Sequence, residues 1–563
     1  MKRSALVISA SFFALSLASL FHSTAALSQP PASNHPLQET GLIYYVRPDG
    51  GSAGQCTGLV DAPYSGAGSE QPCAWNHPFQ ALPPGETPRI MGGDTLLIAA
   101  GEYAMGYGAP GAEGCDEGGS FDCHMPPIPS GPAPDRPTRI LGSGWDSACA
   151  APPVLWGTGR PWFIVNMTDS SHVELDCLEI TDHSTCVENH TGGLACERDQ
   201  LPYGDWASYG LQAEDSTHVH LKNLNIHGLA AGGVHAGRLT DWTVENVRIA
   251  GNGSVGWDGD LWDDLGDANT GSLVFRHWVV EWNGCGETYP EGEPVGCWGQ
   301  EAGGYGDGVG TGETGGDWLI EDSAFLHNTS DGLDLLYHTL GGSVTLNRVR
   351  AEGNAGNQIK IAGQSTLTNA VLVGNCAFFE GQPFTYWVDH CRALGSALLI
   401  AYTGGEQISI VNSTVYGQGD GLIGAGPREG FPCNGSESLQ MRNSIVVGDQ
   451  DYFDSSDVTF YFYQEGCGSL KLDSDYNIMF HVKNIECGVD GDFTTSGSHD
   501  LCADPLLVGP LEGSAYPMTV RADSPAVNSG DPASCPPDDY LGNPRPVDGN
   551  GDGSAVCNRG AYE

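Results

Sequence analysis

The 563-residue sequence has very little positive charge, with 23 Lys and Arg residues against 70 Asp and Glu residues and a formal net charge of −47. This balance excludes a nucleic-acid binder that works by neutralising phosphates. Charged residues make up only 17% of the chain, whereas glycine occurs 81 times and proline 35 times, which argues against a helical bundle. No CxxC pair is present, so nothing supports a thiolate zinc or redox site. The composition favours an all-β protein with many tight turns.

Long apolar runs are also scarce, apart from one at the N-terminus. There MKR is followed by apolar residues 5–20 and by small residues up to Ser28, which is the order of a secretory signal peptide. The run is too short to span a membrane. We expect residues 1–28 to be a cleaved, bacterial-type signal peptide and residues 29–42 a polar linker. The mature protein, free or attached to the cell surface, would lose Lys2 and Arg3 and no acid, so its charge would change from −47 to −49.

The 18 cysteines all follow this leader, and an even number in an exported chain favours disulfides. Several are close neighbours in sequence, and we expect most of these pairs to form local bridges in loops, although the connectivity stays open. The neighbouring pairs are Cys56 and Cys73, Cys115 and Cys123, Cys186 and Cys196, Cys285 and Cys297, Cys376 and Cys391, Cys487 and Cys502, and Cys535 and Cys557.

A pattern of alternating apolar and polar residues repeats between Val173 and Val446. Its copies are VELDCLEI from Val173, VHLKNLNI from Val219, WTVENVRI from Trp242, LVFRHWVV from Leu273, WLIEDSAF from Trp318, VTLNRVRA from Val344, STLTNAVL from Ser365, ISIVNSTV from Ile408 and LQMRNSIV from Leu439. Each copy predicts two short strands joined by a bend. The spacings are 46, 23, 31, 45, 26, 21, 43 and 31 residues. The three longest, about twice the short ones, suggest skipped copies of a solenoid repeat.

The fifth position of the repeat is often asparagine. It holds Asn223, Asn246, Asn369, Asn412 and Asn443. Stacked coils would align these amides in a ladder at the bend. The strand, Asn-bend, strand unit resembles the right-handed parallel β-helix of pectate lyases and related polysaccharide-active proteins. The resemblance implies an all-β, disulfide-stapled solenoid with a β-helix over residues 43–450 and C-terminal coils with a closing segment over residues 451–563. That end of the chain resembles the closing segment of bacterial secreted β-helix proteins.

Acidic residues are densest between Trp257 and Asp334. They include Asp258, Asp260, Asp263, Asp264, Asp267, Asp307, Glu313, Asp331 and Asp334. On a β-helix, side chains of successive coils lie about 5 Å apart, so acids from different turns can converge. Converging carboxylates repel unless a cation lies between them, and ligands that are all oxygen favour calcium. The alternative is that these acids are turn residues and solvated surface.

Lys360 lies one repeat after these acids, in GNAGNQIKIAG, and is one of only five lysines in the chain. In a strand, Ile359 and Ile361 would face the core and Lys360 would face outward beside the acidic turn. A lysine next to bound calcium would have a lowered pKa, as a proton-abstracting base requires. The alternative is an ordinary exposed lysine.

Together, NTSDGLDL and GNAGNQIKIAG are similar to the active-site signature of the family 9 polysaccharide lyases. That resemblance implies that Asp307, Asp331 and Asp334 are calcium ligands and that Lys360 is the catalytic base. The chain departs from the family at Ser330, where a second Asp would directly precede Asp331. The resemblance further implies β-elimination of an acidic, pectate-like polysaccharide by a secreted enzyme. Arg348, Arg350 and Arg392 are candidates for binding substrate carboxylates, or are surface charge, and we expect a monomer.

Two other functions stay open. A non-catalytic glycan-binding or cell-surface β-helix fits the fold equally well. A polygalacturonase-type hydrolase is less favoured, because NTSDGLDL resembles its Asp motif but the family's Asp-Asp, Gly-His-Gly and Arg-x-Lys motifs are missing. Aromatic residues could stack on sugars or fill the core, namely Trp257, Trp262, Trp278, Trp282, Trp298, Tyr386 and Trp387.

The segment VDGNGDG near the C-terminus places Asp548, Asn550 and Asp552 in the order that opens a calcium loop. The twelfth position is Arg559 where an EF-hand has Glu, which excludes an EF-hand. The segment is either a structural calcium site or a plain Asx turn.

Overall fold

The structure is a computed structural model that describes residues 41–188, 190, 192–261, 265–299, 305–417, 421–448, 458–462, 471–483, 497–509 and 518–563. The chain divides into two compact units, residues 1–39 and 40–563, and the described residues belong to the second. The expected signal peptide therefore lies outside the described residues. No described helix is long and apolar enough to cross a membrane.

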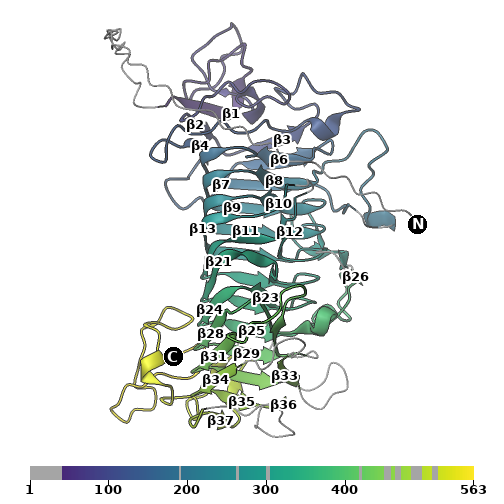
Figure 1. Ribbon diagram of the computed structural model, residues 1–563. Coiled ribbons are helices and arrows are strands. Elements are labelled where there is room, and N and C mark those ends of the chain that lie inside the picture. Colours follow the sequence, from purple (N-terminus) through teal and green to yellow (C-terminus); the bar gives the residue numbers. More distant parts are fainter. Residues whose placement is uncertain are drawn as a thin grey trace, which may run out of the picture. The chain divides into compact units, whose positions relative to one another are not determined.

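The described residues form a parallel β-helix with one 22-stranded and one 11-stranded sheet (Figure 1). The 22-stranded sheet consists of two rows of paired strands joined at a bend, which we call the first and second sheets, and the 11-stranded sheet is the third. The first sheet contains β1 (Ile43–Gly51), β2 (Thr95–Ile98), β4 (Thr138–Gly142), β7 (Ser171–Asp182), β9 (Thr217–His227), β11 (Thr240–Ala250), β13 (Thr270–Glu281), β18 (Thr314–Glu321), β21 (His338–Asn347), β24 (Gln364–Thr368), β28 (Gln407–Val411), β31 (Ser438–Arg442) and β34 (Lys471–Asp475). The second contains β3 (Glu102–Gly106), β5 (Val154–Thr158), the second halves of β7, β9, β11 and β13, and then β19 (Ala324–Leu326), β22 (Arg350–Glu352), β25 (Val371–Gly374), β29 (Thr414–Gly417), β32 (Ile445–Gly448), β35 (Ile478–Phe480) and β37 (Leu501–Cys502).

The third sheet carries the candidate site. It contains β6 (Phe163–Asn166), β8 (Tyr209–Glu214), β10 (Gly232–Gly237), β12 (Val255–Gly259), β17 (Val309–Thr311), β20 (Leu333–Leu335), β23 (Ile359–Ala362), β27 (Leu398–Tyr402), β30 (Ile423–Pro427), β33 (Val458–Phe462) and β36 (Val482–Lys483). Short pieces lie outside the three sheets: β14 (Gly286–Glu287), β15 (Pro294–Val295), β16 (Cys297–Trp298), β26 (Thr385–Trp387), β38 (Leu507–Val508), β39 (Thr519–Val520) and the 3₁₀ helices η1 (Pro78–Gln80), η2 (Ser120–Asp122), η3 (Gly192–Leu194), η4 (Arg392–Gly395) and η5 (Pro532–Ser534).

The nine sequence repeats stack residue on residue in the first two sheets. Val173 pairs with Val219, and Leu273 pairs with both Trp242 and Trp318. The same register continues through Val344 to Leu439. Because the inward positions are apolar apart from a few such as Ser365, one continuous hydrophobic core runs from Val46 to Val482. The predicted parallel β-helix is confirmed.

The expectation that the three longest spacings hide skipped copies is wrong. The strands on either side of each long spacing pair directly, as Val173 with Val219 and Thr366 with Ser409. The extra residues instead form insertions 183–208, 282–308 and 375–397, each between a second-sheet strand and the next third-sheet strand. All three insertions therefore leave the coil at the same corner.

The predicted asparagine ladder lies at the bend between the first and second sheets. All five asparagines adopt positive φ, between 46° and 55°, a region that asparagine tolerates better than most residues. Asn246 donates to Asn223 Oδ1 at 2.6 Å, and Asn443 donates to Asn412 Oδ1 at 3.2 Å. A second, unpredicted ladder lies at the next corner, where the buried side chains of Asn252, Asn283, Asn328 and Asn354 hydrogen-bond in sequence at 2.8–2.9 Å.

Six of the seven neighbouring cysteine pairs form the expected disulfides, and Cys502 is bonded although Cys487 lies outside the described residues. The bridge between Cys149 and Cys177 was not predicted, because its cysteines are 28 residues apart. Each of the three insertions is closed by its own bridge: Cys186–Cys196, Cys285–Cys297 and Cys376–Cys391. The bridges restrict the loops that the β-helix core does not order.

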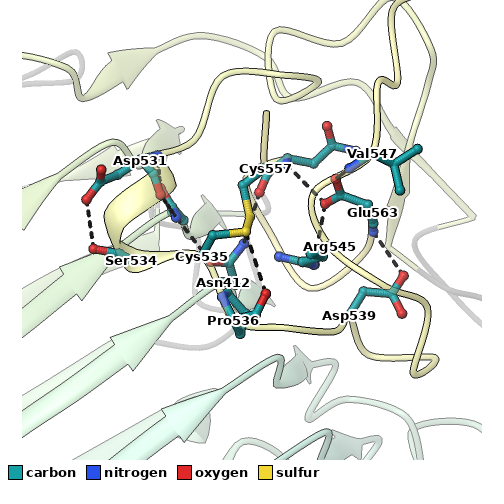
Figure 2. The surroundings of a disulfide bond; sticks show 12 residues. Asn412, Asp531, Ser534, Cys535, Pro536, Asp539, Arg545, Val547, Cys557 and Glu563 are labelled. Atoms are coloured by element: carbon teal, nitrogen blue, oxygen red, sulfur yellow. Dashed lines mark hydrogen bonds and ion pairs between the residues drawn. A yellow bond between two sulfur atoms is a disulfide. The ribbon is translucent and has the colours of Figure 1, made fainter. Parts of the chain in front are cut away.

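The closing segment of the chain packs on the asparagine ladder from outside. Asn412 donates to the carbonyl of Asn558 at 2.9 Å, and Asn443 donates to that of Asp531 at 3.0 Å. Figure 2 shows the Cys535–Cys557 disulfide next to Asn412, with Arg545 turned toward Glu563. The segment thus covers the polar bend between the first and second sheets at these coils.

The second insertion is held to the coils by a buried histidine. His227, at the end of β9, contacts Glu287 Oε1 with Nδ1 at 2.7 Å and Glu179 Oε1 with Nε2 at 3.2 Å. Burial alone would lower the pKa of His227, but hydrogen bonds to Glu179 and Glu287 outweigh it and raise the pKa to about 9. The buried Asp182 also lies near His227 and Glu287, and burial raises the pKa of its carboxyl. The folded state therefore favours the protonated, imidazolium form of His227.

This arrangement predicts pH-dependent stability. The folded pKa of His227 lies above its ordinary value of 6.5, so the stabilisation is complete below pH 6.5 and is lost as pH rises through about 9. A shift of this size corresponds to at most about 3 kcal/mol. Melting curves of wild type and His227→Gln should differ most near pH 6 and converge near pH 10. A melting difference that does not change with pH would contradict this account.

Candidate functional site

Lys360 lies in the middle of the third sheet. It sits on β23 and pairs in register with Asp334 on β20. Ile359 and Ile361 are buried in the core, so alternation turns Lys360 outward, as predicted. The side chain is nevertheless largely buried, at 8% exposure, because the surrounding carboxylates enclose it.

Three carboxylates surround the Lys360 ammonium. Its Nζ lies 2.6 Å from Asp331 Oδ2 and 2.8 Å from Asp334 Oδ2. Asp307 is buried beside them, and ligand atoms of all three aspartates lie within 4.8 Å of one another. The sequence-predicted metal ligands and base therefore come together at one point.

Two of the aspartates also hold the backbone. Asp307 and Asp331 each stand two residues before a third-sheet strand, in successive coils. Asp307 Oδ1 accepts from the Asp331 N–H at 2.9 Å, and Asp331 Oδ1 accepts from the Asn357 N–H at 2.6 Å. One oxygen of each carboxylate thus caps the next coil, and Asp331 directs the other to Lys360. Sequence reasoning missed this structural role, although the equal spacing to the following strand could have shown it.

The charges of the cluster perturb one another. Burial, followed by repulsion from Asp331 and Asp334, raises the pKa of Asp307 to about 7. For Lys360, burial opposes the charge, but attraction to Asp331, Asp334 and Asp307 prevails and raises its pKa. With these carboxylates as its neighbours, the pKa of Lys360 is shifted in the direction opposite to the one expected beside calcium.

The donor set suits a hard divalent cation. The three side chains offer only carboxylate oxygen, which calcium prefers, and they lie close enough to share one ion. Among the described residues this is the one group of three His, Cys, Asp or Glu side chains that could do so. The lysine ammonium lies against one oxygen atom of Asp331 and one of Asp334, two of the residues that would bind the metal.

The three candidate arginines separate in space. Arg392 lines the same cleft as Lys360 and donates to the buried Ser330 Oγ, at the position where the family 9 signature has a further Asp. Arg348 instead pairs with Asp322 at 2.6 Å and with Asp538 of the closing segment at 3.1 Å.

Arg350 lies away from the cleft as well. It pairs with Glu352, which is buried on the second sheet. The structure thus brings only one of the three candidate arginines to the cluster.

The cluster opens into a cleft of about 460 Å³. Its charged lining consists of six acids and two bases: Asp260, Asp267, Asp307, Glu313, Asp331, Asp334, Lys360 and Arg392. Burial and the neighbouring Asp258, Asp267 and Asp334 raise the pKa of Asp260. Asp263 and Asp264 lie outside the described residues. A cleft with this excess of acid attracts cations and repels a polyanion.

The three insertions meet one another in an aromatic cluster. His190 from the first lies 4.7 Å from Trp298 of the second, measured between ring centroids, and Trp298 lies 6.0 Å from Tyr386 of the third. Strands β16 and β26 join the last two insertions. Tyr386 and Trp387 are 58% and 40% exposed.

The other candidate aromatic residues are less exposed than Tyr386 and Trp387 or lie outside the described residues. Trp257 and Trp278 are fully buried in the core, and Trp282 is packed among other aromatics of the insertions. Trp262 lies outside the described residues. Of these seven candidates, the described ones with a largely exposed ring are therefore Tyr386 and Trp387.

The VDGNGDG segment forms a tight turn at the surface. Asp548 Oδ1 accepts from the Gly551 N–H at 2.8 Å, and Asp548 Oδ2 accepts from the Gly553 N–H at 2.9 Å. Asn550 Oδ1 and Asp552 Oδ1 also accept from backbone N–H groups of this turn. These contacts are those of an Asx turn.

No protein-family model and no curated protein matches the chain. Solved structures do match. The pectate lyase Pel9A aligns over 93% of this chain and 96% of its own, with 13% identity and a TM-score of 0.43. The A-module of the Azotobacter vinelandii mannuronan C-5 epimerase AlgE4 aligns over 73% and 91%, with 12% identity and a TM-score of 0.36. An alginate lyase from Paenibacillus sp. aligns over 70% and 93%, with 14% identity and a TM-score of 0.32. At these values the matches assign neither substrate nor site residues to this chain.

The geometry predicts that divalent metal binds at the aspartate cluster. Calcium should raise the melting temperature, and Asp334→Asn should weaken calcium binding about tenfold or more, because one charged ligand is lost. Asp334 is the informative position, since neither of its oxygens caps the next coil in the way that Asp307 and Asp331 do. Asp135→Asn, in an exposed turn, is the control.

The same titration should depend on pH. Because the pKa of Asp307 is about 7, protons compete with metal below that pH, and the calcium affinity should fall by up to about tenfold per pH unit. Calorimetric titrations at several pH values check this. Equal affinities for wild type and Asp334→Asn would show that the metal binds elsewhere.

Proposed function

We propose that this chain is a secreted, calcium-dependent polysaccharide lyase that cleaves a uronate-containing glycan by β-elimination. The observation that carries the proposal is the contact of Lys360 with Asp331 and Asp334, with Asp307 alongside, in an open cleft. A lysine base and a carboxylate-bound cation are the two groups that this reaction needs next to one uronate ring.

Asp307, Asp331 and Asp334 would hold the calcium ion. When bound, the ion would neutralise the substrate carboxylate and make the proton on the neighbouring ring carbon more acidic. Asp307 and Asp331 are suited to hold a cation in a fixed position, because their other oxygens are hydrogen-bonded to the backbone of the next coil.

Lys360 would take the proton at Nζ. The C–H electrons then form the double bond between C4 and C5, the C4–O bond breaks, and the leaving oxygen takes a proton from water. The ammonium seen against Asp331 and Asp334 must first lose its proton, and neutralising those carboxylates removes the charges that raise the Lys360 pKa. The fixed position on β23 keeps Nζ beside the ligands without a mobile loop.

Arg392 is the arginine that we assign to the substrate. It reaches the cleft from the third insertion, its Nη1 donates to Ser330 Oγ, and its charge helps to lower the pKa of Asp331 without a direct ion pair among the described residues. A guanidinium in this state can bind a second uronate carboxylate.

Export is supported by the disulfides, since bridges of this number form in oxidising compartments. The signal peptide predicted from the sequence would direct the chain to the export machinery. An acidic polysaccharide as partner fits the cation site, because a chain with a net charge of −47 meets a polyanion only where cations lie between them.

A non-catalytic glycan-binding protein is the second candidate, and the exposed Tyr386 and Trp387 favour it. A hydrolase fits less well. The oxygen atoms of the three aspartates lie within 4.8 Å of one another and contact a lysine, whereas paired hydrolase carboxylates stand about 5–9.5 Å apart with no cation between them.

The test is absorbance near 232 nm, where the unsaturated product absorbs, on pectate, alginate and glycosaminoglycans. Wild type with calcium should give a rise that a chelator abolishes. Lys360→Ala should lower kcat at least about a hundredfold, as loss of a general base does. The same variant should bind calcium more tightly, because the competing ammonium is gone. Absence of a rise on every substrate by folded protein would leave the glycan-binding candidate.

A further inference from the structure

A second cleft adjoins the acidic one on the third sheet. It has a volume of about 600 Å³ and shares Leu336 and Tyr337 with the first. Its floor is apolar and includes Leu399, which pairs in register with Lys360, and Ala425 on β30. Three outward-facing residues are thus in register on successive strands: Asp334 on β20, Lys360 on β23 and Leu399 on β27. The surface changes along them from charged to apolar.

One cation lies in this apolar cleft. Arg428, directly after β30, places its guanidinium carbon 4.1 Å from the ring centroid of Tyr337. Tyr337 follows β20, so the two side chains together span the edges of β23 and β27. In the part of the chain that the structure describes, Arg428 has no ion pair, and its guanidinium carbon also lies 5.6 Å from the centroid of the Phe431 ring. Glu429 lines the same cleft.

An arginine over a ring and without an ion pair is rare among the described residues: Arg160 also lies over a ring, that of Tyr203, but its Nη1 donates to the Arg198 carbonyl at 2.8 Å. Most arginines of this acidic chain are ion-paired, as Arg238, Arg348 and Arg442 are. A cation held in place by an aromatic ring, on an apolar floor and without a counter-ion, is a recognition group for an anion. Arg428 therefore has a position that the fold does not need for an ion pair.

We propose that the Arg428 and Tyr337 cleft binds a uronate residue of the glycan next to the one that faces Lys360. The inference rests on the proposed function for its ligand class. The sugar ring would pack on Leu399 and Tyr337, and its free carboxylate would pair with Arg428 without a metal. Two strand spacings of about 4.8 Å each separate β23 from β30, so neighbouring residues of one sugar chain reach both clefts.

The consequence is selectivity for free carboxylates at this position. A methyl-esterified uronate would keep the apolar contacts but lose the charge-assisted hydrogen bonds to Arg428, which corresponds to about tenfold weaker binding. Because no metal takes part, this preference should persist in chelator, whereas the cation site is then inactive. The lyase site and this subsite can therefore be tested separately.

The experiment measures binding in EDTA of oligogalacturonate and oligomannuronate, each as the free acid and as its methyl ester of the same length. Wild type should bind at least one free acid about tenfold more tightly than its ester. Arg428→Gln should remove that preference, and Arg428→Lys should keep part of it. Arg136→Gln, which removes an exposed arginine from the turn before β4, is the matched control and should keep it in full.

Kinetics give the second readout. If the lyase is active, Arg428→Gln should raise KM for the free acid about tenfold and leave kcat unchanged, since the contact holds substrate and not the reacting atoms. An unchanged melting temperature shows that the variant folds. Equal binding of acid and ester by wild type, or the same preference in Arg428→Gln, overturns the inference whatever the 232 nm assay shows.

Discussion

Coils stacked in fixed register are the constraint on which the rest of this structure depends. A residue of one coil lies one strand spacing from the equivalent residue of the next, so a feature at one position is repeated or opposed by its neighbours. Repetition of asparagine is favourable, because each amide can both donate and accept. Repetition of aspartate is unfavourable unless a cation is present. The asparagine ladders and the acidic cleft are two outcomes of this same stacking.

The candidate site resembles the asparagine ladders, but aspartate takes the place of asparagine at two of its positions. Asp307, Asp331 and Asn357 occupy equivalent places before successive strands, and each side chain accepts from the backbone of the next coil. Replacing amide by carboxylate keeps that hydrogen bond and adds a charge on the second oxygen. Lys360 then supplies the nearest positive charge from within the sheet. Structural and chemical roles are thus combined in single side chains.

Much of the fold could be predicted because the pattern of strand, bend and strand repeats along the sequence. The nine repeats align to the residue, and the asparagines at their fifth position adopt the bend conformation. The insertions could not be predicted as such, since a spacing does not distinguish a missing coil from a long loop. Six disulfides followed from proximity in sequence, whereas the Cys149 to Cys177 bridge joins residues that only the coils bring together.

Part of the candidate site could be predicted from the sequence in the same way. Asp331, Asp334 and Lys360 lie in one repeat interval, and in-register pairing converts that interval into contact. Arg348 and Arg350 lie in a neighbouring strand segment, but that segment belongs to another face of the coil, where they pair with Asp322 and Glu352. Arg428 gave no signal, because its ring partner Tyr337 lies about ninety residues earlier.

The three insertions can differ in length and sequence, whereas the strands that they join are fixed by the register of the coils. Each leaves the coil at the same corner and is closed by its own disulfide, so its length does not alter the register of the strands that it joins. The entropic cost of a longer loop grows only slowly with its length. Residues can therefore be added to the insertions or exchanged in them while the coils that hold the aspartates and Lys360 stay in place, so the surroundings of the cluster can change without moving it.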